Sequence, residues 1–327
     1  MSLAKYVHAM GRGPSRGRSL TRYESHDAML QILSGDASPE AVGALLMLMR
    51  YRGEVAEEIA GFVDAMREGL HGWSGIGASV DWPSYAAGRS RGVPWFLLSA
   101  RLIARAGHPV LLHGWNSHQG NAADVRKAVA LLGIPEVETP DAAASELDRS
   151  GLAYVPLDAI DPRILTLLRL RDIFGLRSAV NTCCRMLNPA LAPTSVQGVF
   201  HPGYRPLQQE AGELLGQHHL LVLKGGGGEF ERNPAKTIEF WGLRGGARVQ
   251  ISAPPLKQEH RTLADAEPDP AHLTALWTGA LKDPFAEVVV TGTAAAVLLA
   301  TGAVETLEHA EADAEALWHD RHRSIAA

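Results

Sequence analysis

Hydrophobic positions near the N-terminus recur at helical spacing. One helix is expected over residues 25–34, and a second begins at Ser38, an N-cap residue followed by Pro39 at the first helical position. In residues 54–68 the apolar side chains fall on one stripe, as in an amphipathic helix: Val55, Ile59, Phe62, Val63 and Met66. The short connections between these helices predict a small helical bundle.

Farther along the chain, short apolar runs alternate with helical segments. The strand-like runs are 110–112, 153–155, 196–200, 220–223, 237–241 and 248–252. The helical segments are 94–106, 122–132, 161–174, 207–215, 271–281, 286–300 and 304–318. This alternation predicts an α/β sheet with helices on both faces. Residues 72–85 are rich in Gly and Ser, so we expect a functional loop there.

The composition excludes disordered and fibrous proteins, because 46% of the 327 residues are hydrophobic and 20% are charged. We expect no membrane-spanning segment and no membrane partner, because no run of 18 apolar residues occurs. We also see no secretory signal in residues 1–20. The two cysteines, Cys183 and Cys184, are neighbours and cannot form an ordinary structural disulfide. A cytoplasmic location is the simplest expectation.

The net charge of −5 hides an uneven distribution. Residues 263–320 hold one lysine against 11 acidic residues, whereas the preceding chain has more basic than acidic residues. Residues 1–23 contain five basic residues and no acid, and residues 173–209 contain three arginines and no acid. Such asymmetry predicts a polyanionic partner.

Candidate contacts to nucleic-acid phosphates follow from these basic clusters, because a guanidinium donates two parallel hydrogen bonds to phosphate oxygens. The candidates are Arg12, Arg16, Arg18, Arg89, Arg91, Lys224, Arg232 and Lys236. Lys224 stands directly before four glycines, whose amides are accessible to anions. The aromatic side chains Trp82, Tyr85 and Trp95 could stack bases. The alternatives are a solvated basic segment for residues 12–22 and core packing for the tryptophans.

Several segments together resemble anthranilate phosphoribosyltransferase and its nucleoside phosphorylase relatives. They are residues 43–50, 53–61, His113-Gly114 after an apolar strand, and residues 175–190. The resemblance implies a helical subdomain, residues 1–70 with 161–190 packed on it, beside a larger α/β subdomain, residues 71–160 and 191–327. It further implies a mostly parallel central sheet, a cleft between the subdomains, and a homodimer formed through the helical part.

The resemblance also implies a cleft that binds a phosphoribosyl donor. Its residues in this sequence are Gly75, Gly77, Asp81, His113, Gly114, Asn116 and Arg171. The family's magnesium-binding Asp-Glu pair matches this sequence near Glu229 and Glu231, which are therefore the candidate metal ligands. The family's Gly-Thr-Gly-Gly-Asp phosphate loop is matched by residues 75–81, in which only two glycines remain, and Leu112 stands where the family has a lysine. Loss of these groups removes transition-state stabilisation of about 2–4 kcal/mol each.

Residues 81–91 and 224–234 resemble the YbiB-type branch of this family, which implies dimeric, sequence-independent binding of DNA or RNA. The leading hypothesis is therefore a nucleic-acid-binding homodimer that requires no cofactor. The alternative is an active phosphoribosyl or glycosyl transferase with an altered acceptor, and only this alternative calls for Mg²⁺. A small-ligand sensor that lacks the reaction is a third possibility.

Overall fold

The computed structural model describes residues 2–13, 15–85, 92–115, 124–258, 261–263 and 269–322. The longer helices are α1 (Ala4–Gly11), α2 (Arg22–Leu33), α3 (Pro39–Arg52), α4 (Ala56–Glu68), α5 (Phe96–Arg105), α6 (Val125–Leu131), α7 (Pro140–Ser150), α9 (Pro162–Arg169), α11 (Ala179–Arg185), α12 (Tyr204–Leu214), α13 (Ala271–Thr278), α14 (Pro284–Thr301) and α15 (Leu307–His319). Short helical turns are α8 (Leu157–Ile160), α10 (Arg171–Phe174) and η1 (Gly226–Gly228). The strands are β1 (Val80–Ser84), β2 (Val110–Gly114), β3 (Leu152–Pro156), β4 (Thr194–Val199), β5 (His219–Lys224), β6 (Ile238–Arg244) and β7 (Ala247–Ala253).

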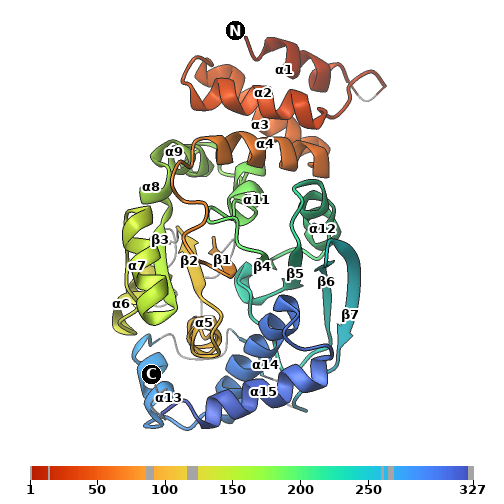
Figure 1. The fold of residues 1–327 in the computed structure, drawn as a ribbon. Coiled ribbons are helices and arrows are strands. Elements are labelled where there is room, and N and C mark those ends of the chain that lie inside the picture. Colours follow the sequence, from red (N-terminus) through yellow and green to blue (C-terminus); the bar gives the residue numbers. More distant parts are fainter. Residues whose placement is uncertain are drawn as a thin grey trace.

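The N-terminal helices begin where their sequence signals predict. Ser38 caps α3 by accepting from the amide of Ala41, and Pro39 occupies the first turn. Thr21 and Glu24 form a capping box at the start of α2. Figure 1 shows α1–α4 together at one end of the molecule. The predicted helical domain is therefore confirmed.

The central sheet has the strand order β3-β2-β1-β4-β5-β6-β7. The first five strands are parallel and the last two antiparallel, so the predicted mostly parallel sheet of an α/β domain is confirmed. The chain order reverses between β1 and β4, and ligands of such sheets bind outside the carboxyl ends of the strands at this switch point.

Strand β1 lies inside the segment expected to be a functional loop, and the correction has a physical cause. Pro83 lacks an amide hydrogen, which argues against a central strand. In the structure β1 pairs with β2 along its whole length but with β4 only through Val80 and Asp81. The ladder between β1 and β4 ends before Pro83, so the two strands are unpaired at the carboxyl edge.

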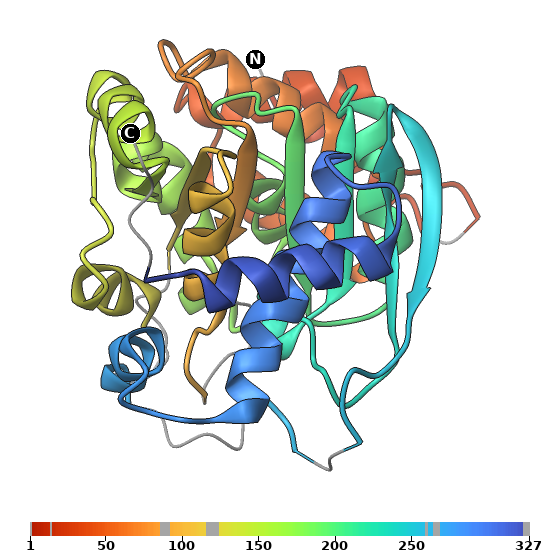
Figure 2. The same ribbon diagram turned by 60° about the horizontal axis from the view of Figure 1, so that its bottom comes forward.

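Two hydrophobic cores cover the two faces of the sheet. One contains side chains of α5, α14 and α15 together with Val110, Leu112 and Tyr154. In Figure 2, α15 lies across α14 on this face. The other joins the N-terminal bundle to Leu111 and Val155 of the opposite sheet face. Helix α14 is long and apolar enough to cross a membrane, but 78% of it is buried, as in a core helix.

Candidate functional site

A cavity of about 500 Å³ opens beside the carboxyl end of β4. Val199 and Phe200 follow from that strand, and α12 supplies the next wall. The opposite wall comes from α3, α10, α11 and the loop between α10 and α11. The lining residues are Arg50, Arg171, Asp172, Gly175, Leu176, Arg177, Ser178, Asn181, Thr182, Arg185, Val199, Phe200, His201, Tyr204 and Gln208. The cavity therefore lies between the helical part and the sheet, near the switch point.

Four arginines line this cavity and give it a strong positive charge: Arg50, Arg171, Arg177 and Arg185. We call them the arginine pocket. Asp172 is the one acidic residue in the lining among the described parts of the chain, and its side chain is 58% exposed. Burial, followed by the charges of the other three arginines, lowers the pKa of Arg177 to about 10. Burial also lowers the pKa of Arg185. The surroundings of both guanidinium groups therefore disfavour their positive charge, and a bound anion would stabilise it.

Arg185 connects the pocket to the edge of the sheet. It comes from the last turn of α11 and is only 5% exposed. Its Nη1 donates to the side-chain oxygen of Asn181 at 2.7 Å, and its Nη2 donates to the carbonyl of Tyr85 at 3.0 Å. Tyr85 directly follows β1, so this guanidinium lies where β1 and β4 separate.

Some residues that line this cavity carry buried polar atoms without a hydrogen-bond partner in the described part of the chain. Gln208 is 1% exposed, and neither atom of its amide has a hydrogen-bond partner among the described residues. The same holds for one terminal nitrogen of Arg171 and for Nε of Arg177. Buried polar groups are normally paired, so such atoms indicate where a ligand binds.

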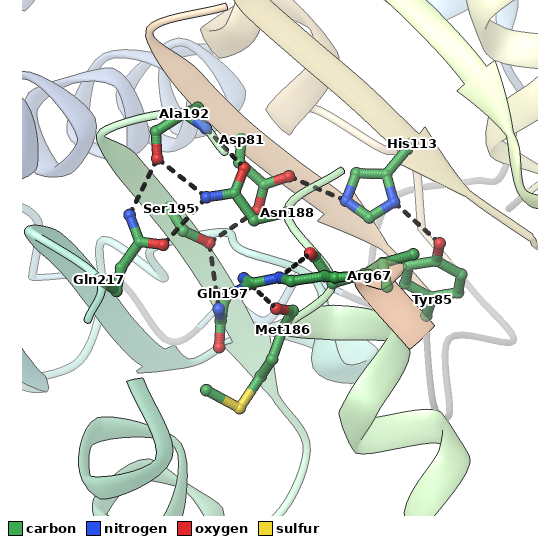
Figure 3. A network of polar contacts seen from close by, with 11 residues as sticks. Arg67, Asp81, Tyr85, His113, Met186, Asn188, Ala192, Ser195, Gln197 and Gln217 are labelled. Carbon is green, nitrogen blue, oxygen red and sulfur yellow. Dashed lines mark hydrogen bonds and ion pairs between the residues drawn. The ribbon is translucent and has the colours of Figure 1, made fainter. Parts of the chain in front are cut away.

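A buried chain of hydrogen bonds runs between neighbouring strands of the sheet (Figure 3). His113 bonds the hydroxyl of Tyr85 at 2.8 Å and the carboxylate of Asp81 at 3.0 Å. Asp81 also accepts from Ser195 Oγ at 2.8 Å, and Gln197 donates to the same Oγ at 3.1 Å. Asp81 and His113 are fully buried. Both were predicted to line a donor cleft, but this chain joins three strands inside the sheet.

The glycines predicted to form the donor cleft have structural explanations. Gly75 and Gly77 precede β1, away from the carboxyl edge where a parallel sheet binds its ligands, so their match to the phosphate loop is wrong. Their φ angles of 77° and 87° require glycine. Gly114 is needed because a Cβ atom there would lie 2.1 Å from the Ser84 carbonyl oxygen. Asn116 lies outside the described residues.

The four glycines after β5 form a tight turn rather than an open amide cradle. Gly225 donates to Val199, Gly228 to Gly225, and Glu229 to Gly226. A Cβ atom on Gly225 would lie 1.6 Å from the Glu229 carbonyl oxygen. The turn therefore needs glycine for close packing.

Glu229 and Glu231 do not fit a magnesium ion in this arrangement. Both are fully buried; Glu229 accepts from the Ser84 hydroxyl at 3.1 Å and Glu231 from the Phe96 amide at 3.0 Å. The described residues contain no cluster of three or more His, Cys, Asp or Glu side chains. Magnesium bound through one or two carboxylates keeps several waters and substrate phosphates, which need open space. These glutamates instead tie the glycine turn to β1 and α5.

The basic residues proposed to contact phosphates do not form one group. Arg12, Arg16 and Arg18 are exposed on the N-terminal segment, where Arg18 pairs with Glu24 at 2.6 Å. Lys224 and Lys236 are exposed on either side of the glycine turn. Arg89 and Arg91 lie outside the described residues.

Two further parts of the predicted nucleic-acid surface are buried. Arg232 is fully buried and pairs with Glu311 at 2.5 Å, so it cannot reach a phosphate polymer. Trp82, Tyr85 and Trp95 are at most 2% exposed and therefore offer no face to a base.

Sequence reasoning identified Arg171 but not Arg50, Arg177 or Arg185 as site residues. A signal was present, because Arg177 and Arg185 lie in the acid-free stretch 173–209. Arg50 could not be found this way, since only the fold brings the end of α3 to this cavity.

Comparisons with known proteins agree on one family. Residues 12–69 match a model described as "Glycosyl transferase family, helical bundle domain". The chain is 30% identical over 305 residues to an anthranilate phosphoribosyltransferase of Geobacillus kaustophilus, covering 90% of this chain and 88% of the relative. It is 31% identical over 238 residues to the enzyme of Bacillus caldotenax, covering 71% and 96%.

Solved structures share the fold along nearly the whole chain. The anthranilate phosphoribosyltransferase of Thermus thermophilus superposes with a TM-score of 0.76 at 24% identity, covering 98% of this chain and 95% of that one. The Saccharomyces cerevisiae enzyme in complex with PRPP and Mg superposes with a TM-score of 0.77 at 16% identity, covering 98% and 94%.

These relatives overturn the leading hypothesis from the sequence. The prediction of DNA or RNA binding is wrong, because the matched relatives are phosphoribosyltransferases and nothing in the comparisons points to a nucleic-acid partner. Basic clusters in the sequence do not show which arginines the fold brings together, and the arginine pocket forms only in the folded chain.

Proposed function

The chain belongs to the anthranilate phosphoribosyltransferase family, and from this premise we propose that it transfers a phosphoribosyl group from phosphoribosyl pyrophosphate to an anionic acceptor. The observation that carries the proposal is the arginine pocket, which lies beside the switch point of the sheet. Its finer place in the YbiB-type branch stays a prediction, as do the homodimer and the cytoplasmic location.

In the proposed reaction, a nucleophilic nitrogen of the acceptor bonds to the anomeric carbon of the ribose. The bond from that carbon to the pyrophosphate oxygen breaks, pyrophosphate leaves with the bonding electrons, and the nitrogen loses its proton to water. The arginine pocket binds the anionic group of the acceptor and fixes where its nitrogen points. Arg185 contributes most to this placement, because its guanidinium reaches the carbonyl of Tyr85 at the end of β1.

The apolar part of the same cavity orients the ring of an aromatic acceptor. Leu176 and Phe200 line it and are 54% and 42% exposed, so they present apolar surface to a ligand. Phe200 also packs edge-on against His201, with ring centroids 4.8 Å apart. A bound ring covers these side chains and excludes water from the arginines, which strengthens their attraction for the anion.

Magnesium accompanies PRPP in the solved yeast relative. When bound to a diphosphate, this ion neutralises the negative charge that grows on the leaving group. Glu229 and Glu231 are buried, and one oxygen of each already accepts a hydrogen bond from the protein, so no step of the proposed transfer is assigned to a metal ion held by them.

The test is an assay of pyrophosphate release from PRPP, with and without Mg²⁺ and with anthranilate as the first acceptor. We expect release that depends on the acceptor. In Arg185→Gln, kcat/KM should fall about 100-fold, a loss comparable to that of one charged contact in the transition state. Arg169→Gln is the matched control, because Arg169 is exposed near the pocket and does not line it. No release with any aromatic amine would refute the proposal.

A further inference from the structure

The charges around the arginine pocket are compensated unequally. Arg50 donates to the hydroxyl of Tyr204 at 2.9 Å, and that hydroxyl donates to Glu54 at 3.1 Å, so a carboxylate stands close behind Arg50. Arg171 has Asp172 at 3.9 Å. Both of these arginines therefore have an acidic neighbour that offsets part of their charge.

Among the described residues, Arg177 and Arg185 lack an acidic partner at ion-pair distance, and of the carboxylates only the more distant charge of Glu229 acts on Arg185. No described carboxylate lies within ion-pair distance of either guanidinium. Arg185 bonds only neutral oxygens, those of Asn181 and Tyr85. Arg177 makes no hydrogen bond with any described residue, and its Nε is buried. An uncompensated buried charge costs several kcal/mol per ion, roughly, unless a counter-charge arrives.

One carboxylate cannot pair bidentately with both groups. A carboxylate that bridges two guanidinium groups offers each of them one oxygen, whereas two carboxylates offer each group a bidentate pair. Arg185 lies deep in the cavity and is 5% exposed, whereas Arg177, in the loop before α11, is only half-buried. A ligand with one anionic group would therefore leave at least one of the two arginines without a bidentate partner, in a site from which the ligand has excluded water.

The remaining lining indicates what joins the two anionic groups. Leu176 and Phe200 offer an apolar wall, and the unpaired amide of Gln208 offers one donor and one acceptor. The cavity of about 500 Å³ is also within the range that accommodates ligands larger than a single substituted ring. The lining therefore suits a planar ring with polar substituents on more than one side.

We propose that the acceptor of this protein is an aromatic amine with two separate anionic groups, one paired with Arg185 and the other with Arg177. This inference rests on the proposed function, because only a transferase has an acceptor. The binding of such an anion, however, does not require that transfer occurs.

The test is calorimetric titration of the full chain, with and without PRPP, using two ligands that differ by one carboxylate. The ligands are anthranilate and 2-aminoterephthalate, with 4-aminoisophthalate as a second geometry. We expect at least one dicarboxylate to bind tenfold or more tightly than anthranilate. That advantage should shrink as the salt concentration rises, because two ion pairs are screened instead of one.

Variants assign the two anionic groups. Arg177→Gln should lower dicarboxylate affinity at least tenfold and anthranilate affinity much less, so that the preference disappears. Arg177→Lys should restore part of it, and Arg169→Gln should leave both affinities unchanged. Circular dichroism of each variant checks that the fold is kept.

The outcomes separate this inference from the proposed function. Equal affinity for the mono- and dicarboxylates, an equal loss of both in Arg177→Gln, or no binding of any of these anions overturns the inference. Efficient transfer to anthranilate without a preference for dicarboxylates overturns the inference alone. Tight dicarboxylate binding without pyrophosphate release overturns the proposed function alone.

Discussion

At the scale of single residues, Asp81 illustrates how a polar group can be structural although its surroundings suggest chemistry. Its carboxylate is fully buried between β2 and β4 and accepts from both His113 and Ser195. Removing any residue of this hydrogen-bonded network leaves a buried polar group unpaired, and an unpaired buried donor costs about 1–3 kcal/mol of folding free energy.

Asp81→Ala should therefore destabilise the protein by about 3 kcal/mol, because it leaves two buried donors without an acceptor. Ser195→Ala removes one of the two donors to Asp81 and the acceptor of Gln197, so it leaves one buried donor unpaired and should cost about 2 kcal/mol. Urea denaturation of both variants measures the difference. A loss below that of Ser195→Ala would contradict the structural role of Asp81.

Glu24 provides a prediction about pH. The hydrogen bond from Arg18 is the main cause that lowers its pKa to about 2, from 4.5 in the unfolded chain. Its stabilising contribution is therefore complete above pH 4.5 and is lost as the pH falls toward 2. In Glu24→Gln, the denaturation midpoint should fall less between pH 5 and pH 3 than in the wild type. Glu138→Gln, at an exposed site, is the control and should follow the wild type.

At the scale of elements, β4 packs closely against the segment that follows the glycine turn, and this contact holds the carboxyl end of β4 in place. A Cβ atom on Gly198 would lie 2.1 Å from the Glu229 carbonyl carbon and 2.4 Å from the Phe230 nitrogen. Both are backbone atoms, so neither can rotate away. Strand β4 and the segment after the turn are thus in direct backbone contact, next to the site.

Gly198→Ala should cost about 2 kcal/mol or more, because the added methyl group overlaps main-chain atoms. We also expect transferase activity to fall, since the turn would shift relative to β4. Gly203→Ala is the control, because a Cβ atom there meets nothing within 4 Å, and its cost should stay within about 0.5 kcal/mol. Chemical denaturation and the pyrophosphate assay give the two readouts, and a neutral Gly198→Ala would disprove this close packing.

The elements also show how far sequence reasoning reaches. The start of α3 at Pro39 and the apolar strand β5 follow from local signals and were predicted. Strand β1 was missed because it ends a stretch rich in Gly and Ser, and the sequence does not show that pairing with β4 ends at Asp81, before Pro83. The arginine pocket was missed for a similar reason. Its members come from α3, α10, α11 and the loop between α10 and α11, and only tertiary packing brings them together.

At the scale of the whole molecule, the N-terminal helices and the sheet share one hydrophobic core. Phe62 of α4 is fully buried in the same cluster as Val155 of β3 and Tyr85 after β1. The helical part therefore does not bury its apolar surface alone. We expect one cooperative unfolding transition rather than two.

Phe62→Ala tests this coupling. The substitution should cost about 3–5 kcal/mol through the cavity that it leaves. All seven tryptophans follow α4 in the sequence, so their fluorescence reports on the rest of the chain. The fluorescence midpoint should shift together with the far-ultraviolet circular dichroism midpoint. An unchanged fluorescence midpoint would mean that the bundle unfolds independently.

The position of α14 has a consequence for biosynthesis. This helix packs against α5, β4 and β5, which precede it by many residues, and nearly all of its side chains are buried there. While a ribosome is still translating the earlier strands, the sheet face that α14 later covers has no partner. We therefore expect the apolar face of the sheet to stay exposed in the nascent chain until residues 284–301 emerge, which makes a partly synthesised chain prone to aggregate.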